Sequence, residues 1–291
     1  MPKHGLILVN AYAPELYTRQ VSRLKEELEL RSAIMEVKRN NEFSANIKNS
    51  RTDIAFPYDF CVFLDKDKYI SHMLEKAGVR LFNTARAVEI CDDKMTTHIA
   101  LADSGIPMPD TLPAPLCYDK TAKPDAAMLD AIERKLGYPV IVKAAFGSLG
   151  NGVFKADDRA ELEYLCEQLK LQPHLFQKYI SASHGKDMRV IVIGGKVIGG
   201  MIRRSDNGDF RSNIGLGGSA EASDVPQDIR SAAEKAASIL RLDYCGIDFL
   251  LGDTPMLCEV NSNAFFDAFE NATGINVAAK YAEHILSETG K

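Results

Sequence analysis

Three oxygen-bearing side chains near the C-terminal end of the sequence have the types and the spacing of a metal site. Two apolar stretches within residues 245–261 flank a Gly-Asp-Thr-Pro turn and are predicted to form a β-hairpin. Alternation along the second strand puts Glu259 and Asn261 on one face, where Asp248 of the first strand could meet them. Carboxylate and amide oxygens are ligands that suit Mg²⁺. The alternative is a solvated sheet face, but the apolar surroundings favour burial, and a buried carboxylate needs a cation.

A glycine-rich loop that follows a strand-terminal lysine predicts a phosphate site. Residues 147–152 read Gly-Ser-Leu-Gly-Asn-Gly, so backbone N–H groups can turn toward an anion and the hydroxyl of Ser148 adds a donor. Its three glycines are Gly147, Gly150 and Gly152. Lys143 ends the preceding strand and would bring a positive charge to the same space. The loop lacks the GK[ST] of a Walker A loop, and a hairpin turn without function is the alternative. Lys94, in the first turn of a predicted helix, is a weaker candidate of the same kind.

A third set of residues could bind an anion. Asp187 and Arg189 occupy alternate positions of one predicted strand and therefore share a face. A polar, glycine-rich loop predicted over residues 203–218 is surrounded by Arg203, Arg204, Arg211 and Asn213. Clustered arginines can hold a substrate carboxylate or a transferring phosphoryl group, and a solvated basic loop is the alternative. The six histidines are isolated, and no Gly-x-Ser-x-Gly elbow indicates a serine hydrolase.

The elements that must position these residues begin as an alternation of strand and helix. Residues 1–90 are predicted to form a small parallel, Rossmann-like sheet whose first helix spans 15–30, without a GxGxxG fingerprint after the first strand. A helix over 93–104 and a proline-rich connector over 109–124 follow. The remaining predicted elements are strands over 137–143 and 175–180, a hairpin of 187–193 with 196–202, and helices over 126–135, 159–169, 226–240 and 277–286.

The composition is that of an ordinary globular protein. The 291 residues are 46% hydrophobic and 26% charged, and the formal net charge of −5 argues against nucleic acid as the main partner. Six scattered cysteines without a CxxC pair favour reduced thiols in a cytoplasmic protein over a disulfide framework or a zinc site. We expect no membrane association, because no signal-peptide pattern and no bilayer-spanning apolar run is present. The oligomeric state, including a homo-oligomer, is left open.

In their order and spacing, these motifs resemble the ATP-grasp superfamily and, within it, the RimK-type carboxylate–amine ligases. The resemblance is strongest over residues 91–285. It is carried by Asp93-Lys94, Val142-Lys143, Gly147-Ser-x-Gly-x-Gly152, Gln177-Lys-Tyr-Ile180, Asp187-Met-Arg189, Gly208-Asp-Phe-Arg-Ser-Asn213, Gly246-Ile-Asp248 and Glu259-Val-Asn261. It implies an α/β fold, α+β in the ATP-grasp part. The implied parts are a Rossmann-like domain over 1–90, a central lobe with the phosphate loop over 91–182 and a C-terminal lobe with the metal site over 183–291.

The resemblance also implies roles for individual residues. Lys94 and Lys143 would contact the phosphates of ATP, which the loop 147–152 would cover. A hinge strand would hold adenine mainly through its backbone, and its residues are Gln177, Lys178, Tyr179 and Ile180. Asp187 would lie near the ribose. The resemblance places three further residues beside the phosphates or an acyl-phosphate, namely Arg211, Ser212 and Asn213. Two ions of Mg²⁺ or Mn²⁺ would be bound by Asp248, Glu259 and Asn261.

Two departures from the family pattern concern the hinge and the acceptor site. Lys178 stands where the family usually has glutamate, with little expected effect because the adenine contact is mainly made by backbone. After Asn261 the family often reads Ser-Pro-Gly, whereas this chain reads Ser262-Asn263-Ala264-Phe265-Phe266. The second departure leaves the identity of the substrate undetermined, but it does not change the reaction that the resemblance implies.

The implied activity is formation of an amide bond at the expense of ATP. A carboxylate of a peptide, a protein or a small molecule would attack the γ-phosphate, and the acyl-phosphate would be trapped by an amine, such as that of glutamate, with release of ADP and phosphate. A D-alanyl-D-alanine-type or carrier-protein ligase of the same fold is one alternative. A nucleotide-binding module without turnover is another, and the complete set of predicted lysines and metal ligands argues against it.

Overall fold

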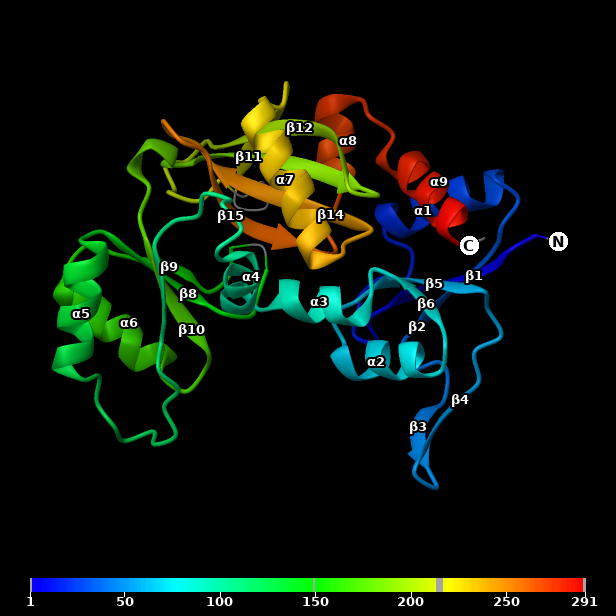
Figure 1. Ribbon diagram of the computed structural model, residues 1–291, viewed down its shortest axis with the longest axis horizontal. Helices are drawn as coiled ribbons and strands as arrows, with labels where there is room; N and C mark the ends of the chain where they lie inside the picture. The colour runs from blue at the N-terminus through cyan, green and yellow to red at the C-terminus, as the bar shows by residue number, and fades with distance from the viewer. Residues whose placement is uncertain (1, 149, 213–216, 290–291) are drawn as a thin grey trace.

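Three larger sheets organise the part of the chain that the computed structural model describes, which is residues 2–148, 150–212 and 217–289. A parallel sheet is formed by the N-terminal part, and two antiparallel sheets by the middle and C-terminal parts (Figure 1). This mixture of helices and strands confirms the predicted α/β class. Asn213, which the sequence places near the phosphates, lies outside the described residues.

The N-terminal sheet consists of four short strands, all parallel, in the order β2-β1-β5-β6. Their bounds are β1 His4–Val9, β2 Ile34–Arg39, β5 Phe60–Leu64 and β6 Arg80–Phe82. The two central strands β1 and β5 are almost entirely buried, which is why both read as continuous apolar runs instead of alternating ones. Helix α1 (Arg19–Leu30) lies between β1 and β2 in the chain, and α2 (Lys68–Lys76) between β5 and β6.

Helix α1 begins at Arg19, not at Glu15 as predicted. The side chain of Thr18 caps it by accepting a hydrogen bond from the backbone N–H of Val21. The start is therefore set by the capping residue and not by the onset of the apolar period. An antiparallel hairpin of β3 (Ala45–Lys48) and β4 (Arg51–Ile54) was not predicted, because neither strand carries an apolar run.

Two helices connect the N-terminal sheet to the middle of the molecule (Figure 1). They are α4 (Lys94–Leu101), which lies within the helix predicted over 93–104, and α3 (Ala85–Asp92), which was not predicted. The break falls at Asp93, whose carboxylate accepts hydrogen bonds from the backbone N–H groups of Met95 and Thr96 and so caps α4. Lys94 is thereby fixed as the first residue of a new helix.

The middle sheet is antiparallel in the order β7-β10-β8-β9. Its strands are β7 Thr111–Pro113, β10 His174–Lys178, β8 Val140–Ala144 and β9 Val153–Ala156. Strand β7 lies within the stretch predicted to be an irregular proline-rich connector. Helices α5 (Ala126–Leu136) and α6 (Arg159–Leu169) share one hydrophobic cluster with this sheet.

The C-terminal sheet is antiparallel in the order β13-β12-β11-β14-β15. Its strands are β11 Lys186–Ile193, β12 Lys196–Ser205, β13 Gly218–Ser223, β14 Tyr244–Leu250 and β15 Met256–Asn261. Strand β12 is longer than predicted, so Arg203 and Arg204 belong to a strand and not to the loop. Strand β13 was missed because its sequence, GSAEAS, is small and polar. Helices that follow or interrupt the strands are α7 Gln227–Leu240, α8 Asp267–Thr273 and α9 Val277–Glu288.

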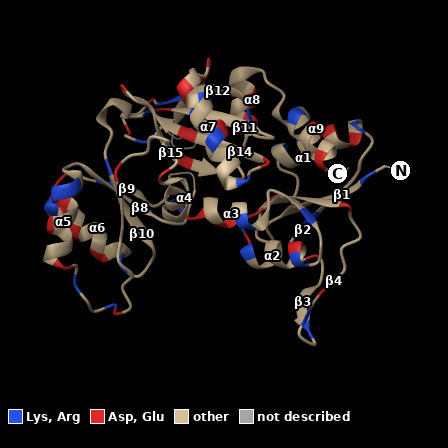
Figure 2. Ribbon diagram, viewed as in Figure 1, with Lys and Arg blue, Asp and Glu red and all other residues tan. Residues whose placement is uncertain are grey.

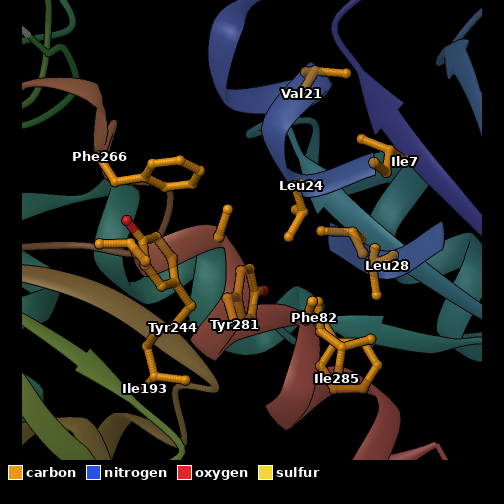
Figure 3. Packing of buried hydrophobic residues seen from close by; sticks show 14 of the residues in the cluster. Ile7, Val21, Leu24, Leu28, Phe82, Ile193, Tyr244, Phe266, Tyr281 and Ile285 are labelled. Atoms are coloured by element: carbon orange, nitrogen blue, oxygen red, sulfur yellow. The ribbon is translucent and has the colours of Figure 1, made fainter. Parts of the chain in front are cut away.

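One hydrophobic core joins the N-terminal sheet to the C-terminal sheet. Side chains of α1, such as Leu24, and of α9, such as Tyr281, belong to the same buried cluster as Tyr244 of β14 (Figure 3). Helix α8 begins beside this cluster, and Phe266 before it is fully buried. The position of the N-terminal sheet relative to the hairpin of β14 and β15 is therefore fixed by packing.

A single buried amide also ties these two parts together. Asn83 donates hydrogen bonds to the backbone carbonyls of Tyr244 and Ser262, both at 2.7 Å, and accepts from the backbone N–H groups of Asp243 and Tyr244. We predict that Asn83→Ala lowers the free energy of unfolding by about 3 kcal/mol, because buried backbone groups lose their partners. Urea unfolding measures this, with the exposed Asn46→Ala as a control that should change little. A loss below about 1 kcal/mol would contradict the prediction.

Charges of both signs are intermingled along the outer helices. Figure 2 shows basic and acidic residues side by side on α5 and α7, and some of them form surface ion pairs with neighbouring elements, such as Glu234 of α7 with Lys196 of β12. Such exposed pairs contribute little to stability. Within residues 2–148, 150–212 and 217–289, no helix has the length and the apolar character needed to cross a bilayer.

Candidate active site

A cleft with an empty volume of about 860 Å³, part of it open to solvent, separates the middle sheet from the C-terminal sheet. We call it the interlobe cleft. Side chains from both sheets line it, and six of them carry most of the sequence predictions: Lys94, Lys143, Asp187, Arg203, Asp248 and Glu259. The structure therefore brings together residues that lie up to 165 positions apart in the chain.

Two buried lysines stand at one end of the interlobe cleft. The backbone N–H of Lys94 donates to the carbonyl of Ala145 at 3.0 Å, which attaches the start of α4 to the end of β8. The Nζ of Lys94 donates to the carbonyl of Gly147 at 2.9 Å and lies 3.6 Å from Oε1 of Glu259. The Nζ of Lys143 lies 3.4 Å from Sγ of Cys258 on β15. Both lysines are 9% exposed or less, so each contributes a poorly solvated positive charge to the cleft.

The glycine-rich loop closes over this end of the cleft. Gly147, Gly150 and Gly152 all have positive φ angles, from 75° to 129°, which glycine adopts without steric cost. A side chain at Gly152 would bring Cβ within 2.9 Å of Cβ of Ala144, so the loop can approach β8 only with glycine there. Arg211 Nη1 donates to the carbonyl of Gly150 at 3.0 Å and is itself held by Asp209 at 2.7 Å. Arg211 therefore joins the glycine-rich loop to the opposite side of the cleft.

The end of strand β10 and the residues after it, which the sequence analysis expects to form a hinge, also line the interlobe cleft. Gln177 is buried and donates to Oγ1 of Thr111 at 3.0 Å, whereas the side chain of Lys178 is exposed. The hydroxyl of Tyr179 lies 2.5 Å from Nδ1 of His184. Apolar side chains from both sheets and from the segment after β10 also line the cleft, namely Ile141, Val153, Ile180 and Leu250. Two apolar walls beside a strand with backbone groups are suited to a flat heterocycle.

Two cross-strand pairs of an acid and an arginine lie side by side on the C-terminal sheet, and three of the four residues line the cleft, namely Asp187, Arg203 and Asp248. Asp187 of β11 is opposite Arg203 of β12, and Arg189 of β11 is opposite Asp248 of β14. Arg203 Nε donates to Asp187 at 2.8 Å and its Nη2 lies 2.9 Å from Asp248. Arg189 donates to both oxygens of Asp248 at 2.7 Å each. The predicted common face of Asp187 and Arg189 therefore carries a continuous network of charges.

Burial and charge act in opposite directions on this network. Burial by itself would raise the pKa of Asp248, but Arg189 and Arg203 outweigh it and lower that pKa to about 2. Burial would likewise lower the pKa of Arg203, but Asp248 and Asp187 raise it above its usual value. Asp248 is therefore an anion and Arg203 a cation at every physiological pH.

The three predicted metal ligands come from the β14–β15 hairpin. Asp248 and Glu259 are register partners, and Asn261 is paired with Gly246. Nδ2 of Asn261 is buried and has no hydrogen-bond partner among the described residues. Because the two ends of a carboxamide are exchanged by a half turn, this position can equally present an oxygen to a cation. No group of three or more His, Cys, Asp or Glu residues suited to a metal occurs in the described part of the chain. Two carboxylates and one amide are hard oxygen donors, so the set fits Mg²⁺.

One predicted residue points away from the cleft. Arg203 and Arg204 are adjacent on β12, so their side chains lie on opposite faces of the sheet. Arg203 is buried in the network described above, whereas Arg204 is exposed and pairs with Glu221 of β13 at 2.8 Å. Ser212 is buried and lines the cleft. The two arginines at the start of the loop predicted over 203–218 thus lie on opposite faces of the C-terminal sheet.

The sequence interpretation treated two residues near the site as incidental. Arg189 was noted only for sharing a face with Asp187, although it holds Asp248 with two hydrogen bonds. His98 was taken as an isolated histidine, but it lies one helical turn after Lys94 and faces Gln177, with 3.4 Å between the two side-chain nitrogens. Its four-residue spacing from Lys94 is the signal that could have revealed it.

The buried imidazole of His98 predicts a dependence of stability on pH. Burial, with a smaller contribution from the charge of Lys143, lowers the pKa of His98 to about 4, so the folded state holds it neutral where the unfolded chain, with a pKa near 6.5, is protonated. Stability is then fully present above about pH 6.5 and falls by about 3 kcal/mol as the pH drops toward 4. Urea unfolding from pH 7.5 to 4.5 should show this slope, and His98→Gln should remove most of it. The remainder comes from His174, whose pKa burial also lowers, and from carboxyl groups such as those of Glu27 and Asp209, whose pKa values hydrogen bonds lower. An unchanged slope in His98→Gln would contradict the prediction.

Comparison with known protein families and curated proteins gives a consistent result. A model described as RimK-like ATP-grasp domain matches residues 91–285. The human protein named N-acetylaspartylglutamate synthase A is 39% identical over 236 residues, which cover 78% of this chain and 59% of the human protein. A protein of Methanococcoides burtonii named probable alpha-L-glutamate ligase is 36% identical over 225 residues, which cover 76% of this chain and 72% of that protein. The chain thus spans about three fifths of the length of the human relative.

Solved structures show the same fold at low sequence identity. The ATP-grasp ligase PsnB, in a complex with a phosphomimetic variant of its minimal precursor, Mg and ADP, has a TM-score of 0.72 at 19% identity over 98% of both chains. The D-alanine–D-alanine ligase of Bacillus anthracis complexed with ATP has a TM-score of 0.75 at 19% identity over 99% of this chain and 97% of that one. The predicted ATP-grasp fold is confirmed. Given the match over residues 91–285, this chain belongs to the RimK-like ATP-grasp family.

Proposed function

We propose that the protein is an ADP-forming carboxylate–amine ligase that uses ATP and Mg²⁺ to form an amide bond. The observation that carries this proposal is the convergence of Lys94, Lys143 and Glu259 in a cleft that apolar side chains also line. A nucleotide placed along this cleft has its base between the apolar walls and its phosphates beside the lysines. Family membership and the names of the relatives support the reaction class.

The residues of the chain act mainly by binding and by electrostatics. Lys94 and Lys143 neutralise charge on the transferring phosphoryl group, and their low exposure strengthens this effect. The glycine-rich loop, joined to Arg211, excludes water from the phosphates and from an acyl-phosphate. Asp248, Glu259 and Asn261 would hold magnesium, which when bound supplies positive charge to the phosphate oxygens. Two ions, with Mn²⁺ as a substitute, are part of the proposal, because Glu259 borders both this cleft and a neighbouring one.

The remaining site assignments follow from the same placement. Asp187 is proposed to lie near the ribose, and the hinge 177–180 to contact adenine through its backbone, so that the side chain of Lys178 stays free. Arg203, Arg211 and Ser212 are proposed to lie by the phosphates. Arg204 is not retained, since it pairs with Glu221 on the other face. We also propose that the chain divides into an N-terminal domain over 1–90 and two ATP-grasp lobes over 91–182 and 183–291, and that it acts in the cytoplasm.

The amine substrate is proposed to be an amino acid such as glutamate. The human and archaeal relatives carry glutamate in their names, as a product component or as the substrate that is ligated. The carboxylate substrate is proposed to be a small carboxylic acid or the C-terminal carboxylate of a peptide. The second candidate function is a D-alanyl-D-alanine-type ligation, which the similarity to the Bacillus anthracis structure favours as far as the fold is concerned.

A screen for ATP-dependent phosphate release tests the proposal. The protein is incubated with ATP, Mg²⁺, a panel of amino acids and a panel of carboxylic acids and short peptides, and mass spectrometry identifies any amide formed. We expect phosphate release that requires one carboxylate and one amine together. Phosphate release with D-alanine alone would favour the second candidate. Binding of ATP without turnover in any combination would identify a nucleotide-binding module instead.

A further inference from the structure

A second cleft adjoins the interlobe cleft and is not explained by nucleotide binding. It lies between the N-terminal sheet and the β14–β15 hairpin, and we call it the second cleft. The residues that matter for its chemistry are Asn10, Asp65, Arg189, Glu259 and Asn261. Glu259, Gly147 and Ser148 line both clefts, so the two spaces meet beside the metal ligands and the phosphate loop. A molecule in the second cleft would reach the end of a bound nucleotide that carries the γ-phosphate.

The N-terminal wall of this cleft is a topological switch point. The parallel strands have the order β2-β1-β5-β6, so the chain leaves β1 toward one side of the sheet and later returns on the other side at β5. The loops that follow β1 and β5 therefore diverge and leave a crevice at the carboxyl ends of these two strands. Asn10 directly follows β1 and Asp65 directly follows β5, and both line the second cleft.

Asp65 is a buried carboxylate whose partners carry no charge. It is 7% exposed, and its oxygens accept hydrogen bonds from Nδ2 of Asn10 at 3.1 Å, Nδ2 of Asn40 at 2.8 Å and the backbone N–H of Lys66 at 2.7 Å. The ammonium of Lys66 is instead paired with Asp92 at 2.6 Å. Burial raises the pKa of Asp65, as expected for a carboxylate that lacks a cation. Uncharged donors fix its orientation, while its negative charge remains uncompensated among the described residues.

Arg189 supplies the opposite charge from the C-terminal wall. Its Nε and Nη2 donate to Asp248, while its Nη1 has no acceptor among the described residues. The guanidinium lines the second cleft but not the interlobe cleft, and Asp248 lines the interlobe cleft but not the second. Asp248 therefore holds the guanidinium rigidly with one edge directed to a carboxylate in the second cleft, since a guanidinium presents five N–H donors in a fixed geometry.

On these grounds, and building on the proposed ligase function, we propose that the second cleft binds the amine substrate as a zwitterionic α-amino acid. Its ammonium is held by Asp65 and its carboxylate by Arg189. The amide side chain of Asn263 also lines the cleft and adds a polar group to the pocket. The shared border at Glu259 places the amine beside the position where an acyl-phosphate would form. Asp65 is then a specificity-determining residue that selects a free α-amino group.

A thermodynamic cycle tests whether Asp65 and the ammonium interact. The protein is saturated with Mg²⁺ and a non-hydrolysable ATP analogue, and calorimetry measures the binding of the twenty standard L-amino acids and of the N-acetyl derivative of the tightest binder. We expect wild type to bind the free amino acid on the order of 10- to 100-fold more tightly than its N-acetyl derivative. In Asp65→Asn this preference should vanish, with affinity lost for the free amino acid only. A purely structural role of Asp65 would weaken both ligands equally, and that result would overturn the proposal.

Matched variants and a second cycle separate the remaining outcomes. Asp59→Asn, at the opposite end of β5 where Asp59 accepts from the backbone of His4, should leave the preference unchanged. Arg189→Gln should abolish discrimination between the amino acid and its α-carboxamide, and Arg204→Gln, on the outer face of β12, should not.

If Asp65→Asn fails to fold, the comparison of the free and the N-acetylated compound on wild type still tests the proposal. Equal affinity of wild type for the free and the N-acetylated compound, or binding of no amino acid in the panel, would overturn the proposal. Turnover in the phosphate-release screen combined with either result would retain the ligase function and discard this assignment.

Discussion

Lys143→Met is expected to abolish ligation and to weaken ATP binding while leaving the protein folded. The side chain of Lys143 is 8% exposed at the end of β8 and lines the interlobe cleft, with its Nζ 3.4 Å from Sγ of Cys258. Methionine keeps the volume of the aliphatic stem and removes the charge. We expect ATP affinity to fall on the order of 10- to 100-fold and turnover by about 1000-fold or more, because a fixed charge in a site of low dielectric acts most strongly on the charge that develops during phosphoryl transfer.

Calorimetry with ATP and the rate of phosphate release measure the two effects separately. Lys196→Met is a suitable control, because Lys196 lies on the outer end of β12 and makes an exposed ion pair with Glu234 at 3.4 Å. The control should bind ATP and turn over like wild type. Thermal unfolding of both variants establishes that the fold is retained. ATP affinity of Lys143→Met within threefold of wild type would exclude this lysine from the phosphate site.

The hairpin of β14 and β15 shows how much of the site follows from sequence alone. The apolar stretches on both sides of a turn predict that Asp248 could meet Glu259 and Asn261 across the hairpin. The direct pairing of Asp248 with Glu259 depends on a register shift after Asp248, since the regular register from the turn would place Cys258 opposite Asp248, and the sequence did not reveal this shift. The same reasoning predicts that Asp187 and Arg189 share a face, as the hydrogen bonds of both show. Local periodicity specifies such relations because neighbouring strands are connected by short turns.

Relations that depend on the longer course of a strand were harder to predict. Strand β13 has a small, polar sequence, and without it the end of β12 was taken as the start of a loop. Once β12 is known to continue through Ser205, its period of two requires Arg203 and Arg204 to face opposite sides. The opposite orientations of Arg203 and Arg204 therefore follow from the sequence, but only after β13 is recognised as the partner that extends β12.

The second cleft could not be predicted at all. Its walls come from the ends of β1 and β5, from the phosphate loop and from the segment after β15, so no local pattern connects them. What brings them together is the shared core of α1, α9 and β14, together with the four hydrogen bonds of Asn83. Tertiary packing over more than 160 residues of sequence thus determines where an acceptor could bind, and this explains why the substrate was left open while the reaction class was not.

Glu259→Gln is expected to reduce turnover by about 1000-fold or more while ATP affinity in the absence of Mg²⁺ changes less than tenfold, because the carboxamide keeps the size of the side chain and removes its charge. Glu259 borders both clefts and lies 3.6 Å from Nζ of Lys94. Two roles are therefore distinguishable: metal ligand, or merely counter-ion of Lys94. If Glu259 is a metal ligand, its replacement should raise the Mg²⁺ concentration needed for half-maximal ATP binding at least tenfold. If Glu259 is only the counter-ion of Lys94, its replacement should leave the Mg²⁺ dependence of ATP binding unchanged.

A matched control completes this experiment. Glu221→Gln removes an equally sized acid from the same sheet, where Glu221 pairs with Arg204 on the outer face, and should change neither turnover nor the Mg²⁺ dependence. Asn261→Asp adds a negative charge where a buried amide nitrogen has no partner, and should increase the affinity for free Mg²⁺. Opposite shifts in Mg²⁺ affinity for Glu259→Gln and Asn261→Asp would locate the ion at the hairpin. Turnover of Glu259→Gln at the wild-type rate would remove the basis for the whole proposed site, since Glu259 is the side chain at which nucleotide, metal and acceptor are expected to meet.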